Sequence, residues 1–365
     1  MKKFFAKQIK LLKLEQLEAS KRQNDELGKY VEAEVDEIIP QPHGGFLLKL
    51  EGETIENEPS FKAGEKVSVG AYIGILKKVI LNTYEIEVSV DSEVFQYKRR
   101  WRIMKLSDDT SFKIMEEALV RMSSKPSSHL MDVLLGLRTP TKADPLSNQA
   151  LSYHNTKLDK SQKKGVEFAL SQKELAVIHG PPGTGKTTTL VEIVYQAVKR
   201  GEKVLVTAAS HVAVDNIAEK LVEAGLNIIR IGKPARITSS VVLNHSVDDR
   251  LAKLGGNIQR EQVILSADVV LGTLIGCGSS LRFLDQFSSC HFQLTIIDEC
   301  GQSLEMACWV VIPRSPRLIL AGDHNQLPPT VLTQSKEAAY ELSRSLMKRV
   351  LDMFFYGFGA HMLQV

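Results

Sequence analysis

The chain has 365 residues, of which 43% are hydrophobic and 24% charged, and its formal net charge is +3. This composition is that of a folded globular protein and excludes a disordered or low-complexity chain. A net charge so close to zero neither requires nor excludes a nucleic-acid partner, so the local clustering of basic residues matters more than their sum.

The N-terminal segment, residues 3–27, contains apolar residues at helical spacing and neither proline nor glycine. This pattern predicts one helix. Its lysines form a basic face, for which we expect a solvated amphipathic helix: Lys2, Lys3, Lys7, Lys10 and Lys13. The segment lacks the uninterrupted apolar core of a signal peptide, and no stretch of the sequence is apolar for long enough to span a bilayer.

From Tyr30 the sequence changes to short β-rich runs separated by Gly, Pro and Asn, which predicts a small barrel. The runs are 30–35, 46–50, 66–69, 73–79 and 85–90. Alternation places Tyr84, Ile86, Val88 and Val90 on one face of the last strand. Two helices are predicted next, over 110–122 and up to Leu135, followed by a turn-rich connection over 138–157.

From about Leu158 apolar runs alternate with helical segments, which predicts an α/β fold with a parallel sheet buried on both faces. The runs are 175–178, 204–207, 228–231, 269–272, 294–297 and 318–321. We therefore expect four parts: an N-terminal helix (1–29), a β-barrel (30–106), helices with a linker (107–150), and an α/β domain (151–365). The four cysteines show no disulfide or zinc spacing, so reduced thiols and a nuclear or cytoplasmic protein are expected.

A glycine-rich loop directly follows the apolar strand at 175–179 and precedes a helix that contains Thr188. It consists of Gly180, Pro181, Pro182, Gly183, Thr184, Gly185, Lys186 and Thr187. This is the G-x-x-x-x-G-K-[ST] pattern in its strand–loop–helix context. The alternative is a chance glycine-rich turn, which the flanking strand and helix disfavour. Backbone N–H groups and the helix N-terminus bind phosphates, Lys186 reaches the β- and γ-phosphates, and the Thr187 hydroxyl is a ligand for Mg²⁺.

An acid pair, Asp298 and Glu299, ends the apolar run at 294–297. In a P-loop fold, an Asp at such a strand end orders the Mg²⁺ shell. The Glu after it can orient and deprotonate the attacking water. The alternative is a pair of solvated acids, which the upstream P-loop disfavours. ATP and Mg²⁺ are the expected cofactors.

Several motifs occur in order along the chain and resemble those of superfamily 1 helicases. They are Asn155, Leu158, Asp159 and Gln162, the P-loop, the segments 207–216 and 298–302, and Gly322–Pro329. The chain is most similar to the 5′→3′ branch that includes the nonsense-mediated-decay helicases, and within it to the immunoglobulin-mu-switch-binding subgroup with its stalk and barrel insertion. The resemblance implies a RecA-like domain and an ATP-dependent helicase.

The resemblance also implies residue roles. Gln162 would read the adenine edge, and Gln326 would sense the γ-phosphate and act with Lys186, Asp298 and Glu299 in catalysis. A single strand of DNA or RNA would lie along Ser210, His211, Thr273, Pro328 and Thr330. Contacts that allow stepping on any sequence must be short, polar and directed to the backbone.

Two positions depart from the family pattern. His211 stands where an Asn is usual, and its charge is expected to vary near neutral pH. Asn325 stands where a Lys is frequent, so one cation near the expected path of the nucleic-acid strand is absent. Neutral drift is the alternative explanation for both.

The densest basic run is Tyr97–Arg102, in which aromatic residues flank Lys98, Arg99 and Arg100. The functional interpretation is a phosphate and stacking contact from the barrel. The structural alternative is a solvated strand face. No residue can be assigned to the 2′-hydroxyl that would separate RNA from DNA.

The resemblance implies that a second RecA-like domain, which supplies arginines across the ATP cleft, is missing from this chain. We therefore expect the chain alone to bind ATP and nucleic acid but to hydrolyse ATP poorly. The alternative is a non-catalytic nucleic-acid-binding module. A GTPase or small-molecule kinase is disfavoured because the sequence has no N-K-x-D motif.

Overall fold

The structure, a computed structural model, describes residues 1–26, 30–41, 45–52, 61, 64–88, 95, 100–105, 109–141, 143, 151–286, 290–323, 325–354 and 360–363. The chain divides into two compact units. The sheet unit comprises Met1–Leu14 and Ser111–Val365, and the barrel unit comprises Glu15–Thr110. The four parts expected from the sequence are finer than this division, and their boundaries stay a prediction.

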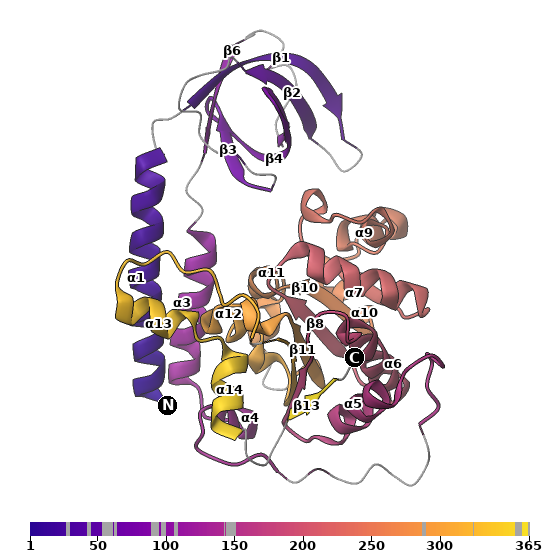
Figure 1. The fold of residues 1–365 in the computed structure, drawn as a ribbon. Coiled ribbons are helices and arrows are strands. Elements are labelled where there is room, and N and C mark those ends of the chain that lie inside the picture. The colour runs from indigo at the N-terminus through magenta and orange to yellow at the C-terminus, as the bar shows by residue number, and fades with distance from the viewer. Residues whose placement is uncertain are drawn as a thin grey trace. The chain divides into compact units, whose positions relative to one another are not determined.

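In its described part, the sheet unit contains a seven-stranded sheet with the order β13-β7-β12-β11-β8-β10-β9 (Figure 1). The strands are β7 (Leu175–His179), β8 (Val204–Ala208), β9 (Ile228–Arg230), β10 (Val269–Thr273), β11 (Leu294–Asp298), β12 (Arg317–Gly322) and β13 (Ala360–Met362). Every neighbouring pair is parallel. All six apolar runs are strands, as the sequence predicts; β13 was not predicted.

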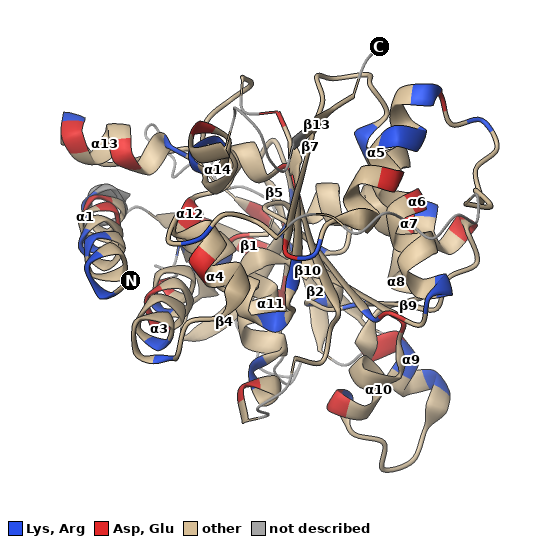
Figure 2. Cartoon of the chain, turned by 90° about the horizontal axis from the view of Figure 1, so that it is seen from below, with Lys and Arg blue, Asp and Glu red and all other residues tan. Residues whose placement is uncertain are grey.

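Helices cover both faces of this sheet, and each face has its own apolar core (Figure 2). One face packs against α5 (Lys160–Ser171), α6 (Lys186–Lys199) and α7 (His211–Glu223). The other packs against α3 (Thr110–Ser124), α4 (His129–Leu134), α11 (Leu274–Ser280), α12 (Glu305–Cys308) and α14 (Leu346–Phe354). Successive strand residues point to opposite faces, so both cores draw on every long strand. The expected α/β fold of the RecA type is confirmed.

Shorter elements complete the sheet unit. They are η1 (Pro234–Arg236), α8 (Ser240–Leu243), α9 (Val247–Leu254), α10 (Arg260–Ser266), η2 (Arg282–Gln286), η3 (Cys300–Gln302), η4 (Ile312–Arg314) and α13 (Lys336–Ser343). The helices α8 to α10 form an excursion between β9 and β10. They leave the strand order unchanged, because β9 and β10 still pair directly.

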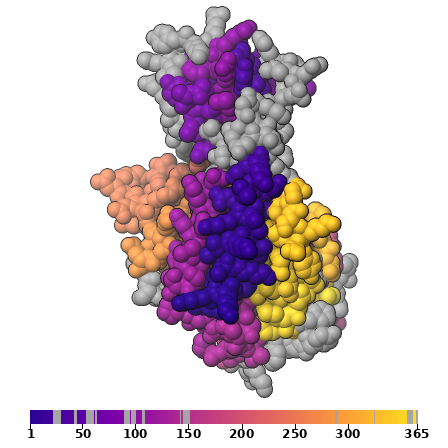
Figure 3. Space-filling view, turned by 90° about the vertical axis from the view of Figure 1, so that its left-hand side faces the viewer, coloured from indigo at the N-terminus to yellow at the C-terminus, as the bar shows by residue number. Residues whose placement is uncertain are grey.

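The first helix, α1 (Lys2–Glu26), begins in the sheet unit and continues in the barrel unit. In the sheet unit it is not simply solvated, because Phe5 is fully buried with its ring centroid 5.0 Å from that of Trp309. Figure 3 shows α1, in indigo, with later parts of the sheet unit on either side. Lys7 and Lys13 pair with glutamates of α13 and α3, respectively. Its basic face is therefore partly neutralised. Among the helices of the described residues, none combines the length and apolarity needed to cross a bilayer.

The barrel unit contains a closed antiparallel barrel with the strand order β1-β2-β5-β4-β3-β6. Its strands are β1 (Tyr30–Pro40), β2 (Phe46–Gly52), β3 (Lys66–Val69), β4 (Tyr72–Ile80), β5 (Thr83–Val88) and β6 (Arg100–Lys105). Tyr84, Ile86 and Val88 are buried, as the alternation predicts. Val90 lies outside the described residues. The predicted barrel is confirmed.

Candidate nucleotide site and nucleic-acid groove

The carboxyl ends of five neighbouring strands carry the motifs found in the sequence. In spatial order, β7 leads into the P-loop, β12 into Asp323, β11 ends at Asp298, β8 leads into Ser210, and β10 ends at Thr273. Ligands of open parallel sheets bind at this edge, outside the carboxyl ends of the strands. The fold thus brings the phosphate loop and the acid pair together on one half of the edge, and Ser210 and Thr273 lie on the other half.

The P-loop has the backbone that its glycines permit. Gly183 and Gly185 have φ values of +83° and +76°, in the left-handed region that favours glycine. Gly185 is the N-cap of α6, so the loop ends at a helix N-terminus, where anions bind. Lys186 Nζ donates to the Gly180 carbonyl at 2.7 Å. Phosphate oxygens, like this carbonyl oxygen, accept hydrogen bonds from the Lys186 ammonium group, so the loop suits a nucleoside triphosphate.

Gln162 lies against the phosphate loop. Its Oε1 accepts from the Asp159 N–H at 3.1 Å within a capping box at the start of α5, and its Nε2 donates to the Thr184 carbonyl at 3.2 Å. A Cβ added at Gly185 would lie 2.3 Å from Gln162 Nε2, so a larger residue there would displace this side chain in addition to straining the positive φ. Gln162 therefore supports the loop, and its contact with adenine stays a prediction.

The acid pair offers a buried, unsatisfied oxygen. Asp298 is only 4% exposed, and its Oδ1 has no hydrogen-bond partner among the described residues. Burial and then the neighbouring Glu299 raise the pKa of Asp298 to about 7. A buried, unpartnered carboxylate oxygen costs free energy unless a cation satisfies it. Hard divalent cations take such oxygen ligands, so Asp298 and the hydroxyl of Thr187 fit the expected Mg²⁺.

Glu299 has an unusual backbone for a residue other than glycine, with φ of +50°. Such strain costs on the order of 1–3 kcal/mol and concentrates at functional sites. Its Oε2 is 3.5 Å from Gln302 Nε2, a contact at the limit of a hydrogen bond. The side chain is half-buried. Its action on the attacking water stays a prediction.

Asp323, which follows β12, joins the P-loop strand to Gln326. One carboxylate oxygen accepts from His179 Nε2 at 3.0 Å and from the Asn325 N–H at 2.9 Å, and the other accepts from Gln326 Nε2 at 3.0 Å. Burial opposes the charge, but these donors outweigh it and lower the pKa of Asp323 to about 2. Gln326 was predicted from the sequence, whereas His179 was not. The position of His179, as the last residue before the P-loop, could have indicated it.

Ser210, two residues after β8, and Thr273, the last residue of β10, cap the helices that follow. Ser210 Oγ accepts from the Ala213 N–H and Thr273 Oγ1 from the Gly276 N–H, both at 3.1 Å. Ser210 is exposed, whereas Thr273 is buried. Pro328 and Thr330 are both exposed after β12. A strand of nucleic acid at this edge would reach the Ser210 hydroxyl more readily than that of Thr273.

His211 is held by a buried ion pair. Its Nδ1 lies 3.1 Å from Nη2 of Arg230, whose Nε donates to Asp215 Oδ1 at 2.8 Å. Burial, followed by the charges of Arg230 and Arg236, lowers the pKa of His211 to about 4. The expectation that its charge varies near neutral pH is therefore wrong. The sequence analysis also missed Arg230, although a charge inside an apolar strand run was visible.

The basic run of the barrel is only partly described, because Lys98 and Arg99 lie outside the described residues. Arg100 and Arg102 project from β6 and donate through Nε to Glu34 and Glu32 of β1, at 2.8 and 3.2 Å. These pairs on an exposed strand face support the structural alternative. The phosphate contact of Lys98, Arg99 and Arg100 stays a prediction.

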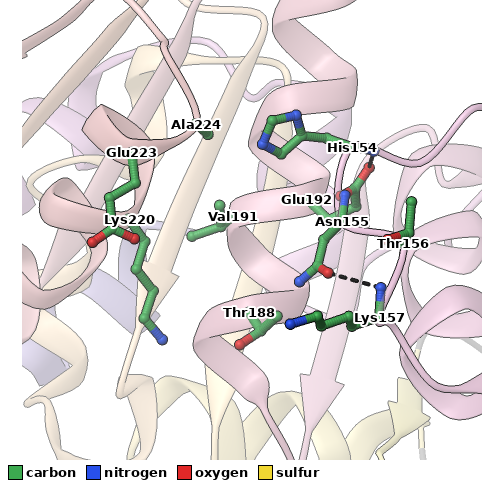
Figure 4. Close-up of a pocket in the computed structure, with 10 residues that line it drawn as sticks. All are labelled: His154, Asn155, Thr156, Lys157, Thr188, Val191, Glu192, Lys220, Glu223 and Ala224. Carbon is green, nitrogen blue, oxygen red and sulfur yellow. Dashed lines mark hydrogen bonds between the residues drawn. The ribbon is translucent and has the colours of Figure 1, made fainter.

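A cavity of about 460 Å³ lies between the segment before α5 and the helices α6 and α7 (Figure 4). Residues 154–157 form one wall, the first turns of α6 form another, and the last turn of α7 forms the third. Thr188, which also belongs to the predicted nucleotide site, lines it two residues after Lys186.

Comparison with known proteins places these motifs in a family context. A family model described as an AAA domain matches residues 157–261 and 247–334. The chain is 39% identical over 320 residues to the DNA-binding protein SMUBP-2 of Mus musculus, covering 74% of this chain and 31% of that protein. It is 30% identical over 355 residues to the DNA polymerase alpha-associated DNA helicase A of Schizosaccharomyces pombe, covering 83% of this chain and 53% of that protein.

A third relative is the ATP-dependent helicase upf1 of Schizosaccharomyces pombe, 34% identical over 285 residues, covering 66% of this chain and 30% of that protein. The chain thus spans about a third to a half of the length of these relatives. The similarities confirm the resemblance, inferred from the motifs, to superfamily 1 helicases.

Proposed function

We propose that this chain, which resembles superfamily 1 helicases in its motifs and its RecA-like fold, contains the first ATP-binding motor domain of an ATP-dependent helicase. The enzyme would move 5′→3′ along single-stranded DNA or RNA. The observation that carries the proposal is the unpartnered Oδ1 of Asp298, on the same sheet edge as a complete phosphate loop. A protein that only binds nucleic acid has no need for this costly arrangement.

The reaction proposed is hydrolysis of ATP by attack of water on the γ-phosphate. Lys186 Nζ, which donates a hydrogen bond to the Gly180 carbonyl in the structure, donates to phosphate oxygens instead when ATP binds. Glu299 orients the water and takes its proton. Gln326, next to Asp323, contacts the γ-phosphate and responds to its loss. Asp298 and Thr187 would hold Mg²⁺, which neutralises phosphate charge when bound.

Nucleic acid is proposed to cross the other half of the sheet edge, at Ser210, His211 and Thr330. The order of the strands supports this, because β11 and β12 separate the P-loop strand β7 from β8 and β10. Gln326 and Thr330 belong to one segment after β12, which gives the two halves a covalent connection. The names of the relatives include both DNA-binding and helicase functions, which supports a nucleic-acid partner.

For the 365-residue chain by itself we propose weak turnover. One RecA-like sheet forms one side of an ATP cleft, and the arginines that stabilise the transferring phosphoryl group come from a second domain in enzymes of this mechanism. Such an arginine contributes about 10³–10⁵ in turnover. The competing proposal is a non-catalytic module, which would bind nucleic acid with an affinity that ATP does not change.

The test is ATP turnover by the purified chain with and without single-stranded DNA and RNA, with Lys186→Ala as the control. We expect ATP binding and slow turnover that Lys186→Ala abolishes. Absence of ATP binding by the folded chain, together with nucleic-acid binding that ATP leaves unchanged, would refute the motor function and favour the non-catalytic module.

A further inference from the structure

A buried carboxylate on α6 holds the chain segment that precedes α5. Glu192 is only 1% exposed. Its Oε1 accepts from the His154 N–H and its Oε2 from the Asn155 N–H, both at 2.9 Å. Gln196, one turn later, donates through Nε2 to Glu192 Oε1 and to the Ser152 carbonyl, both at 2.8 Å. The two side chains thus fix the backbone of residues 152–155 against α6.

The position of Glu192 is unusual for a charge. The buried face of α6 is otherwise mainly apolar and includes Leu190, Ile193, Val194 and Ala197, all fully buried. A buried charge is retained only where hydrogen bonds compensate for its lost hydration. Here both oxygens accept from backbone N–H groups, which would otherwise be left unsatisfied. The carboxylate therefore serves to place the segment.

That segment is a wall of the cavity that α6 and α7 also line (Figure 4). Within it, Asn155 Oδ1 accepts from the Lys157 N–H at 2.9 Å, and the His154 ring lies 4.3 Å from the ring of Tyr195 on α6. The N-terminus of the same helix, α6, is the phosphate-binding end of the loop. One helix therefore sets both the position of the phosphates and the position of this wall.

We propose that Glu192, supported by Gln196, is a positioning residue for the nucleoside part of the bound nucleotide. It fixes the 154–157 wall at a set distance from the phosphate loop, so that base and ribose fit between them. The proposal rests on the proposed binding of ATP and deepens it. The proposal divides the affinity for ATP into two parts. The contacts with the phosphates do not depend on Glu192, whereas the contacts with the nucleoside do.

The test compares two ligands by calorimetric titration of the full 365-residue chain with Mg²⁺ present. ATP uses the phosphate loop and the cavity, whereas inorganic tripolyphosphate uses the loop alone. Glu192→Gln keeps the shape but turns an amide N–H₂ toward a backbone N–H. We expect it to weaken ATP binding about tenfold and to leave tripolyphosphate binding within about twofold, because a buried donor loses its acceptor.

The matched control is Glu167→Gln. Glu167 contacts the same segment, accepting from the Tyr153 hydroxyl at 2.7 Å, but this contact is exposed, so both ligands should bind as in the unmodified chain. Equal weakening of ATP and tripolyphosphate by Glu192→Gln, or no weakening of either, would overturn the proposal. If this variant does not fold, the same comparison on Gln196→Met decides. Failure of the unmodified chain to bind either ligand would instead overturn the proposed function.

Discussion

The buried ion pair between Arg230 and Asp215, next to His211, gives the sharpest stability prediction. Arg230 is fully buried and Asp215 is 1% exposed, with Arg230 Nε 2.8 Å from Asp215 Oδ1. Asp215 Oδ2 also accepts from the N–H and hydroxyl of Thr238, at 2.7 and 2.8 Å. Asp215→Ala leaves a buried guanidinium without its counter-charge. We expect it to lower the free energy of unfolding by about 3–5 kcal/mol.

A double variant separates the cost of the unpaired charge from the worth of the pair. Asp215→Leu combined with Arg230→Met replaces both charges by apolar side chains. Such exchanges are often close to neutral. Because the two donors of Thr238 still lose their acceptor, we expect the double variant to remain about 1–3 kcal/mol below the unmodified chain. It should nevertheless be more stable than Asp215→Ala alone.

The assay is urea unfolding followed by the fluorescence of Trp309. The chain has two tryptophans, and the other, Trp101, belongs to the barrel unit. Trp101→Phe in all variants therefore confines the signal to the sheet unit, which avoids treating two units as one transition. A loss below about 1 kcal/mol for Asp215→Ala would refute the reasoning, because an uncompensated buried charge cannot cost so little. A double variant less stable than Asp215→Ala would refute the charge as its cause.

Three further predictions follow from single side chains. The pKa of His211 is about 4 in the fold, below the usual 6.5, so the neutral imidazole contributes fully to stability above pH 6.5 and this contribution is lost as the pH falls towards 4. The free energy of unfolding of His211→Gln, measured with urea, should therefore change less between pH 6.5 and 4 than that of the unmodified chain. Asp323→Ala removes the acceptor of His179 and Gln326 and should cost about 1–3 kcal/mol in urea unfolding, against no change for a surface variant. Phe5→Ala, which empties a fully buried site against Trp309, should cost about 3–5 kcal/mol; a smaller change than about 1 kcal/mol would mean that α1 is not docked.

The local chemistry of the nucleotide site could be predicted because it is encoded in contiguous residues. A strand, a glycine-rich loop and a helix N-terminus follow one another from Leu175 to Thr188, and their geometry needs no distant partner. The acid pair at the end of β11 was accessible for the same reason. Alternation alone was enough to orient β5 of the barrel.

Some elements escaped the sequence analysis because their stability comes from partners far along the chain. The strand β13 has three residues and exists by pairing with β7. The docked state of α1 depends on Trp309, which no local pattern connects to Phe5. Arg100 was visible as a cation, but its pairing with Glu34 required the register of β6 on β1.

The sequence by itself determined the class of the fold, the phosphate loop and the acid pair, since each depends on short-range geometry and a repeating apolar pattern. Only the tertiary structure decided which polar groups are buried and what they contact. It made His211 neutral by burial beside Arg230, left Asp298 Oδ1 without a hydrogen-bond partner among the described residues, and gave Glu192 two backbone donors. The physical reason is that desolvation and hydrogen-bond partners belong to the packed chain as a whole, and spacing along the sequence does not encode them.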